Sequence, residues 1–178
     1  MPLAYGGGIQ TMEDAERLFA LGVEKVCLHS ALFQSPSLVR DLAARFGSQA
    51  VMACLNVKRS LLGRPTLYAS GARRVEKGDW IGFARNAVES GVGELLLYAV
   101  DRDGTMRGYD EELVREASAA VPVPIVALGG AGQISDLRAV VNAGASAAAA
   151  GAFFVFQGPH RAVLITYPMY SELERLFG

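Results

Sequence analysis

Residues 7–31 read GGIQTMEDAERLFALGVEKVCLHSA, and residues 129–153 read GGAGQISDLRAVVNAGASAAAAGAF. The two stretches align without a gap at a constant offset of 122 residues. Both begin with a glycine pair, continue with an amphipathic segment that ends at a glycine, and finish with a short apolar run. Each stretch therefore predicts a turn, a helix and a strand in the same order.

The segments around this repeat alternate between strands and helices. Short apolar or β-branched runs bounded by glycine and polar turns predict strands, and apolar residues at helical spacing predict helices. Both faces of the strands are apolar, which is typical of a parallel sheet or barrel covered by helices. The expected strands are Pro2–Tyr5, Lys25–His29, Ala50–Val57, Glu94–Val100, Pro124–Leu128 and Ser146–Ala150, and the expected helices are Met12–Leu21, Ser37–Phe46, Asp79–Ser90, Glu111–Ala120, Ser135–Ala143 and Tyr170–Phe177.

The length of the repeat predicts a (β/α)8 barrel of the TIM type. One period holds four β/α units, so two periods would make eight units in roughly 244 residues, the usual size of that barrel. The 178 residues hold about one and a half periods. We therefore expect one domain, residues 1–178, that is an N-terminally truncated barrel of about six β/α units and lacks the first two. We expect either that Met1 is an internal methionine of a longer gene or that a partner chain or a homo-oligomer covers the open strand edges, and an open doubly wound sheet is the alternative fold.

The composition narrows the class of protein. The chain has 17 basic and 18 acidic residues, a net charge of −1 and 51% apolar residues, which is typical of a compact domain and excludes disorder. The balanced charge argues against nucleic acid or an anionic membrane as the main partner. No apolar run is long enough to cross a bilayer and no signal peptide precedes the first strand, so we expect a cytoplasmic protein. Cys27 and Cys54 lie in apolar runs, which predicts buried reduced thiols, with no metal site and no cofactor.

Glycines at two strand ends predict phosphate binding. They let backbone N–H groups approach an anion, and a small residue 22 positions after each pair would complete the site. Two such sites half a barrel apart imply a ligand with a phosphate at each end. The alternative is that these glycines only form tight β–α turns. The residues concerned are Gly7, Gly8 and Ser30 in the first copy, and Gly129, Gly130, Gly151 and Ala152 in the second.

An acidic motif follows the strand Glu94–Val100. Its carboxylates, Asp101 and Asp103, emerge at the same face as the glycines, where barrels of this type carry their active sites. A carboxylate there can hold a ribose hydroxyl or move a proton, and Gly104 and Thr105 can face a phosphate. Capping of a helix by Asp103 is the alternative.

Other polar residues mark the two ends of the expected barrel. Asn56 ends a strand at the ligand face, where an amide can orient a ligand but cannot exchange protons near neutral pH. His29 ends another strand, where ligand contact and packing both remain open. Lys25 and Glu94 begin their strands at the opposite mouth, where charged side chains usually cap the barrel. His160-Arg161 can bind an acidic group or lie in a solvated turn.

Taken together, these motifs resemble the cyclase subunit of imidazole glycerol phosphate synthase, HisF. That family has a (β/α)8 barrel with lyase activity in histidine biosynthesis. It takes ammonia from a glutaminase partner, HisH, and splits a bis-phosphorylated ribulosyl aminoimidazole carboxamide intermediate. The aspartate motif is specific to the family, whereas the glycines are shared with other phosphate-binding barrels. The matching stretches are GGGI at 6–9, FGSQA at 46–50, GELLL at 93–97, DRDGT at 101–105, GYD at 108–110 and GGAG at 129–132.

The resemblance implies roles for individual residues. It replaces the capping interpretation of Lys25 and Glu94 with a place in the charged ring that gates the ammonia passage, and it puts Glu24 at the glutaminase interface. His29 stands where the family usually has asparagine, and Ala152 where it has serine. The implied phosphate ligands are Gly8, His29 and Ser30 at one end and Gly104, Gly130, Gly151 and Ala152 at the other, with Asp103 near the ligand.

Two departures from the family bear on its mechanism. The family's catalytic pair is an aspartate on the first strand, absent here, and a second aspartate at the position of Asn56. Without them, acid–base assistance worth ~10²–10⁴-fold per group is lost, so we expect the 178-residue chain alone to be inactive in the histidine pathway. The stretches KRSLLG at 58–63 and GPHRAVLI at 158–165 are more similar to HisF-like proteins of surface-polysaccharide clusters, which channel ammonia for acetamidino-sugar synthesis. A non-catalytic module that binds sugar phosphates or the glutaminase is the remaining alternative.

Overall fold

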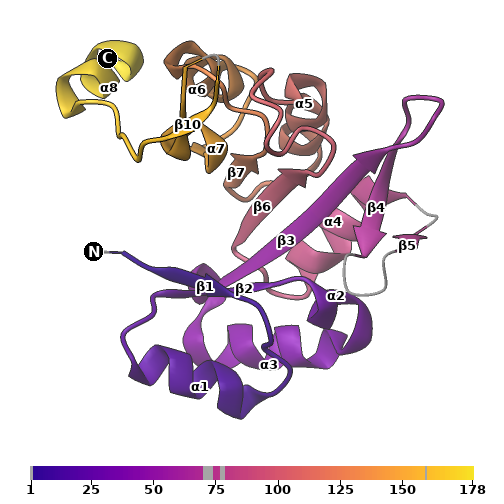
Figure 1. Cartoon of the computed structure of the whole chain (residues 1–178). Coiled ribbons are helices and arrows are strands. Elements are labelled where there is room, and N and C mark those ends of the chain that lie inside the picture. Colours follow the sequence, from indigo (N-terminus) through magenta and orange to yellow (C-terminus); the bar gives the residue numbers. More distant parts are fainter. Residues whose placement is uncertain (1, 70–73, 77–78, 159) are drawn as a thin grey trace.

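The computed structural model describes residues 2–69, 74–76, 79–158 and 160–178. Met1 and Pro159, which belong to the expected chain start and to the GPHRAVLI stretch, lie outside the described residues. A curved sheet with parallel neighbours runs through the molecule in the order β1-β2-β3-β6-β7-β8 (Figure 1). Its strands are Ala4–Gly6 (β1), Lys25–Leu28 (β2), Val51–Arg59 (β3), Glu94–Ala99 (β6), Ile125–Leu128 (β7) and Ala147–Ala149 (β8).

Helices cover the outer face of this sheet and leave its inner face open (Figure 1). The sheet curves between its two edges, β1 and β8, with the N-terminus near one end of the arc and the last helix near the other. The longer helices are Met12–Ala20 (α1), Pro36–Phe46 (α3), Trp80–Glu89 (α4), Glu111–Ala120 (α5), Ile134–Asn142 (α6) and Tyr170–Phe177 (α8), and the short ones are Ser30–Gln34 (α2), Ala152–Val155 (α7) and a 3₁₀ turn, Ser48–Ala50 (η1).

This arrangement confirms the predicted fold class, a partial (β/α)8 barrel. In the described residues six parallel strands follow one another in chain order, each beside the one before it. A doubly wound sheet reverses its strand order part-way and carries helices on both faces, so that alternative is excluded. The chain-order winding with helices outside is that of a TIM-type barrel.

The 122-residue repeat is structural. In the first copy, Asp14 accepts hydrogen bonds at its Oδ2 from the backbone N–H groups of Gln10 and Thr11, both at 3.0 Å. In the second copy, Asp136 Oδ2 accepts from the N–H groups of Gly132 and Gln133, at 2.8 and 3.1 Å. Both carboxylates thereby satisfy N–H groups that the start of a helix leaves without partners. The same contacts recur because an aspartate recurs at the same position of the repeat and its partners are backbone N–H groups.

Antiparallel strands that sequence periodicity did not predict extend the sheet beside β3. The strand β3 runs two residues beyond its expected end at Val57, and past the end of β2 it pairs with Pro65–Ala69 (β4) instead. Arg74–Glu76 (β5) continues this hairpin. A second small sheet joins Phe156–Gln157 (β9) to Ala162–Val163 (β10). These strands are short or lie among turn residues, so their pairing was not visible as a period in the sequence.

Three of the strands, β2, β6 and β7, are buried on one face only. In β6, Leu95 and Leu97 are 1% and 2% exposed beneath the helices, whereas Leu96 and Tyr98 on the inner face are half-buried. The same alternation runs through β2 and β7. The main hydrophobic cluster therefore lies between the sheet and the outer helices. Within the described residues, no helix has the length and apolar character needed to cross a membrane.

This one-sided core predicts different costs for two neighbouring leucines. Leu95→Ala should lower the free energy of unfolding by ~2–5 kcal/mol, because it leaves a cavity under the helices. Leu96→Ala should cost only about 1 kcal/mol, because its side chain is already partly exposed to solvent. Urea unfolding of the two variants checks the difference, and equal losses would contradict the one-sided core.

Candidate functional site

A cavity of about 490 Å³ lies where the ends of β1, β2, β3 and β6 meet. It contains both the first predicted phosphate site and Asn56, the amide that the sequence placed at the ligand face. Parallel strands end at the same edge of a sheet, so residues far apart in the chain converge there. The predicted site residues that line it are Gly7, Gly8, His29, Ser30 and Asn56.

Asn56 and His29 form a hydrogen-bonded ring with Cys54 in the wall of this cavity. The Cys54 thiol donates to Asn56 Oδ1 at 3.2 Å, and Asn56 Nδ2 lies 3.4 Å from His29 Nε2. His29 Nδ1 lies 2.9 Å from the Cys54 carbonyl oxygen, which can only accept, so Nδ1 carries the ring proton and Nε2 accepts from Asn56. The sequence offered no partner for His29. The structure shows that it is oriented by groups on the next strand.

The two cysteines are free, as predicted, but they are half-buried rather than buried. Both face the cavity from adjacent strands. The pKa of the Cys27 thiol is raised above its ordinary value, first by its hydrogen bond with Cys54 and then by burial. Cys27 therefore stays protonated at neutral pH. The inner-face position explains the difference, because apolar neighbours in the sequence do not reveal which face of the sheet a side chain occupies.

Tyr98 is a polar residue of the cavity that sequence reasoning missed. It is the register partner of Asn56 across β3 and β6, so both side chains point to the inner face. Its hydroxyl donates to Asp103 Oδ2 at 2.8 Å. Burial, followed by this hydrogen bond, raises the pKa of Tyr98 to about 12. The two-residue alternation along β6 was the signal that could have identified it.

His29 is the one basic side chain in the lining of the cavity among the described residues. The lining includes no aspartate, glutamate, lysine or arginine among the described residues. Nor does any group of three or more histidine, cysteine or acidic side chains in those residues have the geometry to hold a metal ion. Binding in this cavity therefore depends on hydrogen-bonding side chains, His29 among them, and on backbone N–H groups.

The aspartate motif forms a second, more open hollow of about 410 Å³. Asp103, Gly104 and Thr105 line it together with two arginines, Arg107 and Arg161. Arg161 donates to the carbonyl oxygens of Gly104 and Thr105 at 3.2 and 3.1 Å, which joins the tail of the chain to this loop. The Thr105 hydroxyl donates to a backbone carbonyl of the same loop, so its proton is already used.

The second glycine pair supports this loop through close packing. A Cβ atom at Gly130 would stand 2.2 Å from the Gly108 carbonyl oxygen, and Gly108 N–H donates to the Gly130 carbonyl at 2.9 Å. Only glycine fits at this approach. Gly129 similarly lies against the end of β6. The remaining residues of the second predicted site, Gly151 and Ala152, line neither hollow and sit at the start of the four-residue helix α7.

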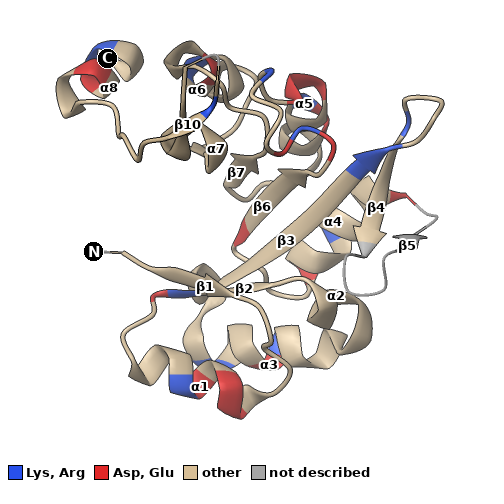
Figure 2. Cartoon of the chain, in the orientation of Figure 1, with Lys and Arg blue, Asp and Glu red and all other residues tan. Residues whose placement is uncertain are grey.

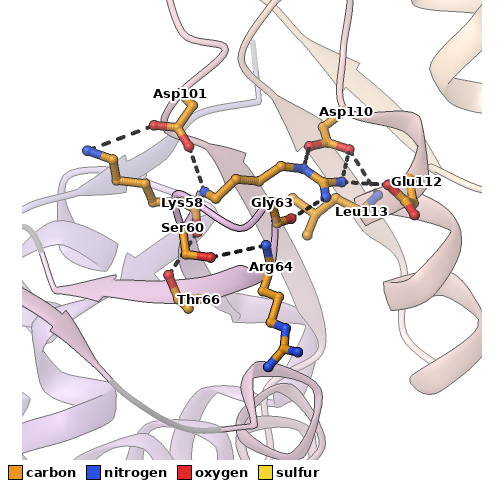
Figure 3. Close-up of polar contacts among 10 residues, drawn as sticks. Lys58, Ser60, Gly63, Arg64, Thr66, Asp101, Asp110, Glu112 and Leu113 are labelled. Atoms are coloured by element: carbon orange, nitrogen blue, oxygen red, sulfur yellow. Dashed lines mark hydrogen bonds and ion pairs between the residues drawn. The ribbon is translucent and has the colours of Figure 1, made fainter.

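Arg59, at the end of β3, contacts the loop after β6 and the start of α5, and Figure 3 shows its partners Asp101, Asp110 and Glu112. Its guanidinium makes two hydrogen bonds to Asp110, from Nε at 2.7 Å and from Nη2 at 2.8 Å, and Nη2 also reaches Glu112. Its backbone N–H donates to Asp101 Oδ2 at 2.6 Å, while Lys58 Nζ lies 3.9 Å from Asp101 Oδ1. Asp101, a predicted catalytic residue, thus faces the end of β3 at the rim and is not part of the cavity wall.

Asp110 is a buried carboxylate with two structural roles. It caps α5 by accepting from Leu113 N–H, and it binds Arg59. Burial alone would raise its pKa, but the hydrogen bonds from Arg59 and Leu113 outweigh it and hold the pKa below the ordinary value. Asp110 therefore stays ionised and ties the loop that carries Asp101 and Asp103 to β3.

The predicted gate residues lie at the opposite end of the sheet. Lys25 and Glu94, the first residues of β2 and β6, form an ion pair across β3, with side chains 35% and 15% exposed. Glu24 precedes Lys25 and is exposed. Figure 2 shows most other charges on the helices and loops, with a basic end of β3 facing the acidic segment before α5.

Comparison of the sequence with known proteins shows which family the chain belongs to. A family model described as histidine biosynthesis protein matches residues 1–159. A Pseudomonas aeruginosa protein, provisionally named imidazole glycerol phosphate synthase subunit hisF2, is 43% identical over 175 residues, which cover 98% of this chain and 70% of that protein. The chain belongs to the HisF family.

Two further relatives agree with this assignment. The HisF subunit of imidazole glycerol phosphate synthase from Alkaliphilus metalliredigens is 41% identical over 155 residues, covering 86% of this chain and 62% of the relative. A Vibrio vulnificus protein provisionally named subunit hisF3 is 43% identical over 177 residues, covering 98% of this chain and 68% of the relative. The resemblance to HisF drawn from the sequence motifs is confirmed.

The contacts of Arg59 predict a large effect on stability. Arg59→Gln should lower the free energy of unfolding by about 3 kcal/mol, because it leaves the buried Asp110 carboxylate without its cation. Arg115→Gln is the matched control, since Arg115 and Glu111 form an exposed pair one turn apart on α5 and should cost no more than ~0.5 kcal/mol. Urea unfolding measures both.

The ion pair between Arg59 and Asp110 also predicts that the stability of the fold depends on pH. Because the folded-state pKa of Asp110 lies below its ordinary 3.8, this carboxylate contributes stability above pH 3.8 and loses it as the pH falls through its folded-state pKa. In Arg59→Gln the folded-state pKa rises, so the loss should begin at a higher pH. Identical acid-unfolding profiles of wild type and variant would contradict this assignment.

Proposed function

We propose that this HisF-family chain binds a bis-phosphorylated ribulosyl aminoimidazole carboxamide at the carboxyl ends of its strands and uses ammonia supplied by a glutaminase. The observation that carries this proposal is the cavity that joins the first glycine site to Asn56, His29 and Ser30. Family membership supports the same ligand, since related proteins are named as imidazole glycerol phosphate synthase subunits.

The two hollows would hold the two ends of this ligand. Gly7 and Gly8 adopt positive φ angles of 119° and 73°, which turn the backbone along the cavity, and Ser30 adds a hydroxyl beside them. One phosphate would bind there through backbone N–H groups with His29 beside them, because the cavity offers no lysine or arginine among the described residues. The other would lie by Gly104 and the second glycine pair, where Arg107 and Arg161 supply positive charge.

A glutaminase of the HisH type is the partner that this proposal requires. Lys25 and Glu94 stand at the end of the sheet opposite the cavity, and Glu24 is exposed next to them. Ammonia entering at that end would pass the ion pair and follow the inner face of the sheet toward Asn56. Lys25 and Glu94 would then gate the passage, with Glu24 contacting the glutaminase.

A second candidate function is ammonia delivery for acetamidino-sugar synthesis on surface glycans. The lack of a carboxylate among the described residues of the cavity wall favours it, because Asn56 takes the place at which the resemblance implies a catalytic aspartate. Asp101 and Asp103 are the remaining carboxylates near the site, one bound to the end of β3 and the other to Tyr98. In this role the chain would bind the glutaminase and conduct ammonia without closing the imidazole ring.

Substitution of Gly8 tests the phosphate site. Gly8→Ala should weaken binding of the bis-phosphorylated ligand roughly tenfold or more, because the strained backbone turns its N–H away from the phosphate. Gly22→Ala is the matched control: Gly22 also has a positive φ, 88° against 73°, with nothing within 4 Å of its Cβ position, but it lies outside the cavity. Isothermal titration calorimetry compares the variants. Equal losses of affinity would contradict phosphate binding at Gly8.

A coupled assay separates the two candidate functions. The chain is mixed with a HisH-type glutaminase, glutamine and the bis-phosphorylated ligand, and both glutamate release and imidazole glycerol phosphate are measured. We expect glutaminase stimulation with little ring closure, because Asn56 cannot move a proton, and Asn56→Asp should raise ring closure. Fast ring closure by the wild type would contradict the delivery role. Failure to stimulate the glutaminase would contradict the proposal that a glutaminase is the partner, and would favour a non-catalytic module that binds sugar phosphates.

A further inference from the structure

Tyr98 lines the cavity, and neither the proposed phosphate site nor the proposed ammonia passage uses it. It comes from β6, directly beside Asn56 of β3, and faces the cavity with it. Its aromatic ring is half-buried on the inner face, where the other residues of β6 that point inward are Glu94 and Leu96. Its hydroxyl is therefore the polar group that β6 contributes to the cavity.

The hydrogen bond to Asp103 determines what this hydroxyl can offer a ligand. A tyrosine hydroxyl has one proton to donate and two lone pairs that accept. The Tyr98 proton is donated to Asp103 Oδ2 at 2.8 Å, and an ionised carboxylate can only accept. The Tyr98 oxygen is thus left with its lone pairs, and the charge-assisted bond to Asp103 makes that oxygen a stronger acceptor.

The neighbouring Asn56 makes hydrogen bonds with residues other than Tyr98. Across the strand pair, Asn56 directs its Nδ2 toward His29 Nε2, and its Oδ1 accepts from the Cys54 thiol. The pKa of Tyr98, raised to about 12 first by burial and then by the bond to Asp103, keeps the proton in place at neutral pH. The phenol therefore stays neutral, and its oxygen stays an acceptor across the physiological range.

We propose that Tyr98, held by Asp103, accepts a hydrogen bond from an N–H or O–H group of the ligand bound in the cavity and selects for ligands with such a donor between their phosphates. This inference rests on the proposed function of the cavity. A ribulosyl aminoimidazole carboxamide carries suitable donors in its hydroxyl, amino and carboxamide groups. Asp103 acts through Tyr98, as a positioning residue.

Calorimetry with the bis-phosphorylated ribulosyl aminoimidazole carboxamide tests the contact. Tyr98→Phe removes the oxygen and keeps the ring, and it should weaken binding about 3- to 10-fold, the range of one hydrogen bond. Tyr170→Phe is the control, since Tyr170 is 76% exposed on α8, outside the cavity. Asp103→Asn is the second variant. It should weaken binding as well, because an amide can donate to Tyr98 and leave the phenol proton facing the ligand.

A spectrophotometric titration gives a readout that a purely structural role would not move. The difference between the wild-type and Tyr98→Phe titrations isolates the ionisation of Tyr98 from that of the other tyrosines. Asp103→Asn should lower the pKa of Tyr98 below the wild-type value, because a neighbouring anion no longer opposes ionisation. An unchanged pKa would overturn the role of Asp103.

The binding results separate the inference from the proposed function. If the wild type binds the ligand and Tyr98→Phe binds it equally well, the inference is overturned and the proposed function stands. If the wild type does not bind the ligand at all, the proposed function fails and the inference fails with it. Weaker binding by Tyr98→Phe and Asp103→Asn, with Tyr170→Phe unchanged, supports both.

Discussion

The pairing of β3 with β6 is the constraint on which the candidate site depends. Six consecutive residues of each strand pair in parallel, from Met52 with Glu94 to Val57 with Ala99. Side chains alternate between the two faces of a sheet, so a slip of one residue would exchange the inner and outer faces of one strand. This register sets Asn56 and Tyr98 side by side on the inner face. It also brings the end of β3 beside the loop that follows β6, where Arg59 meets Asp101.

Beyond the paired residues of β3 and β6, polar side-chain contacts hold the following loop in place. The backbone N–H of Arg59 binds Asp101 and its guanidinium binds Asp110, so the loop between β6 and α5 is held at both ends. Within that loop, Asp103 turns inward to Tyr98, and Asp101 stays at the rim. Charged side chains therefore cluster at the end of β3, whereas no aspartate, glutamate, lysine or arginine of the described residues lines the cavity itself. An anionic ligand would meet arginines only at the second hollow, while the chemistry at its centre depends on hydrogen-bond donors and acceptors.

Much of the fold could be predicted because its signals are local. The helix starts at Thr11 and Gln133 are set by carboxylates three residues later, and this short-range contact appears twice with the same spacing. Strand order followed from the β/α alternation, since a parallel neighbour requires a crossover helix. The hairpin of β4 and β5 was not predicted, because β4 pairs with β3 only where β2 has ended, and that depends on the relative lengths of two strands.

The sequence by itself determined the repeat, the alternation of strands and helices, the partial barrel class and the strand-end position of Gly7, Gly8, His29 and Ser30, whereas Asn56 lies inside β3 rather than at its end. The alternation and the strand ends follow from local periodicity and spacing, and the barrel class follows from the 122-residue offset of the repeat. The tertiary structure alone decided which of these residues share a cavity, that Tyr98 stands beside Asn56, and that Asp101 and Asp103 have different partners. Those facts depend on register and twist between strands distant in the chain, and no local pattern specifies the angle at which two side chains meet.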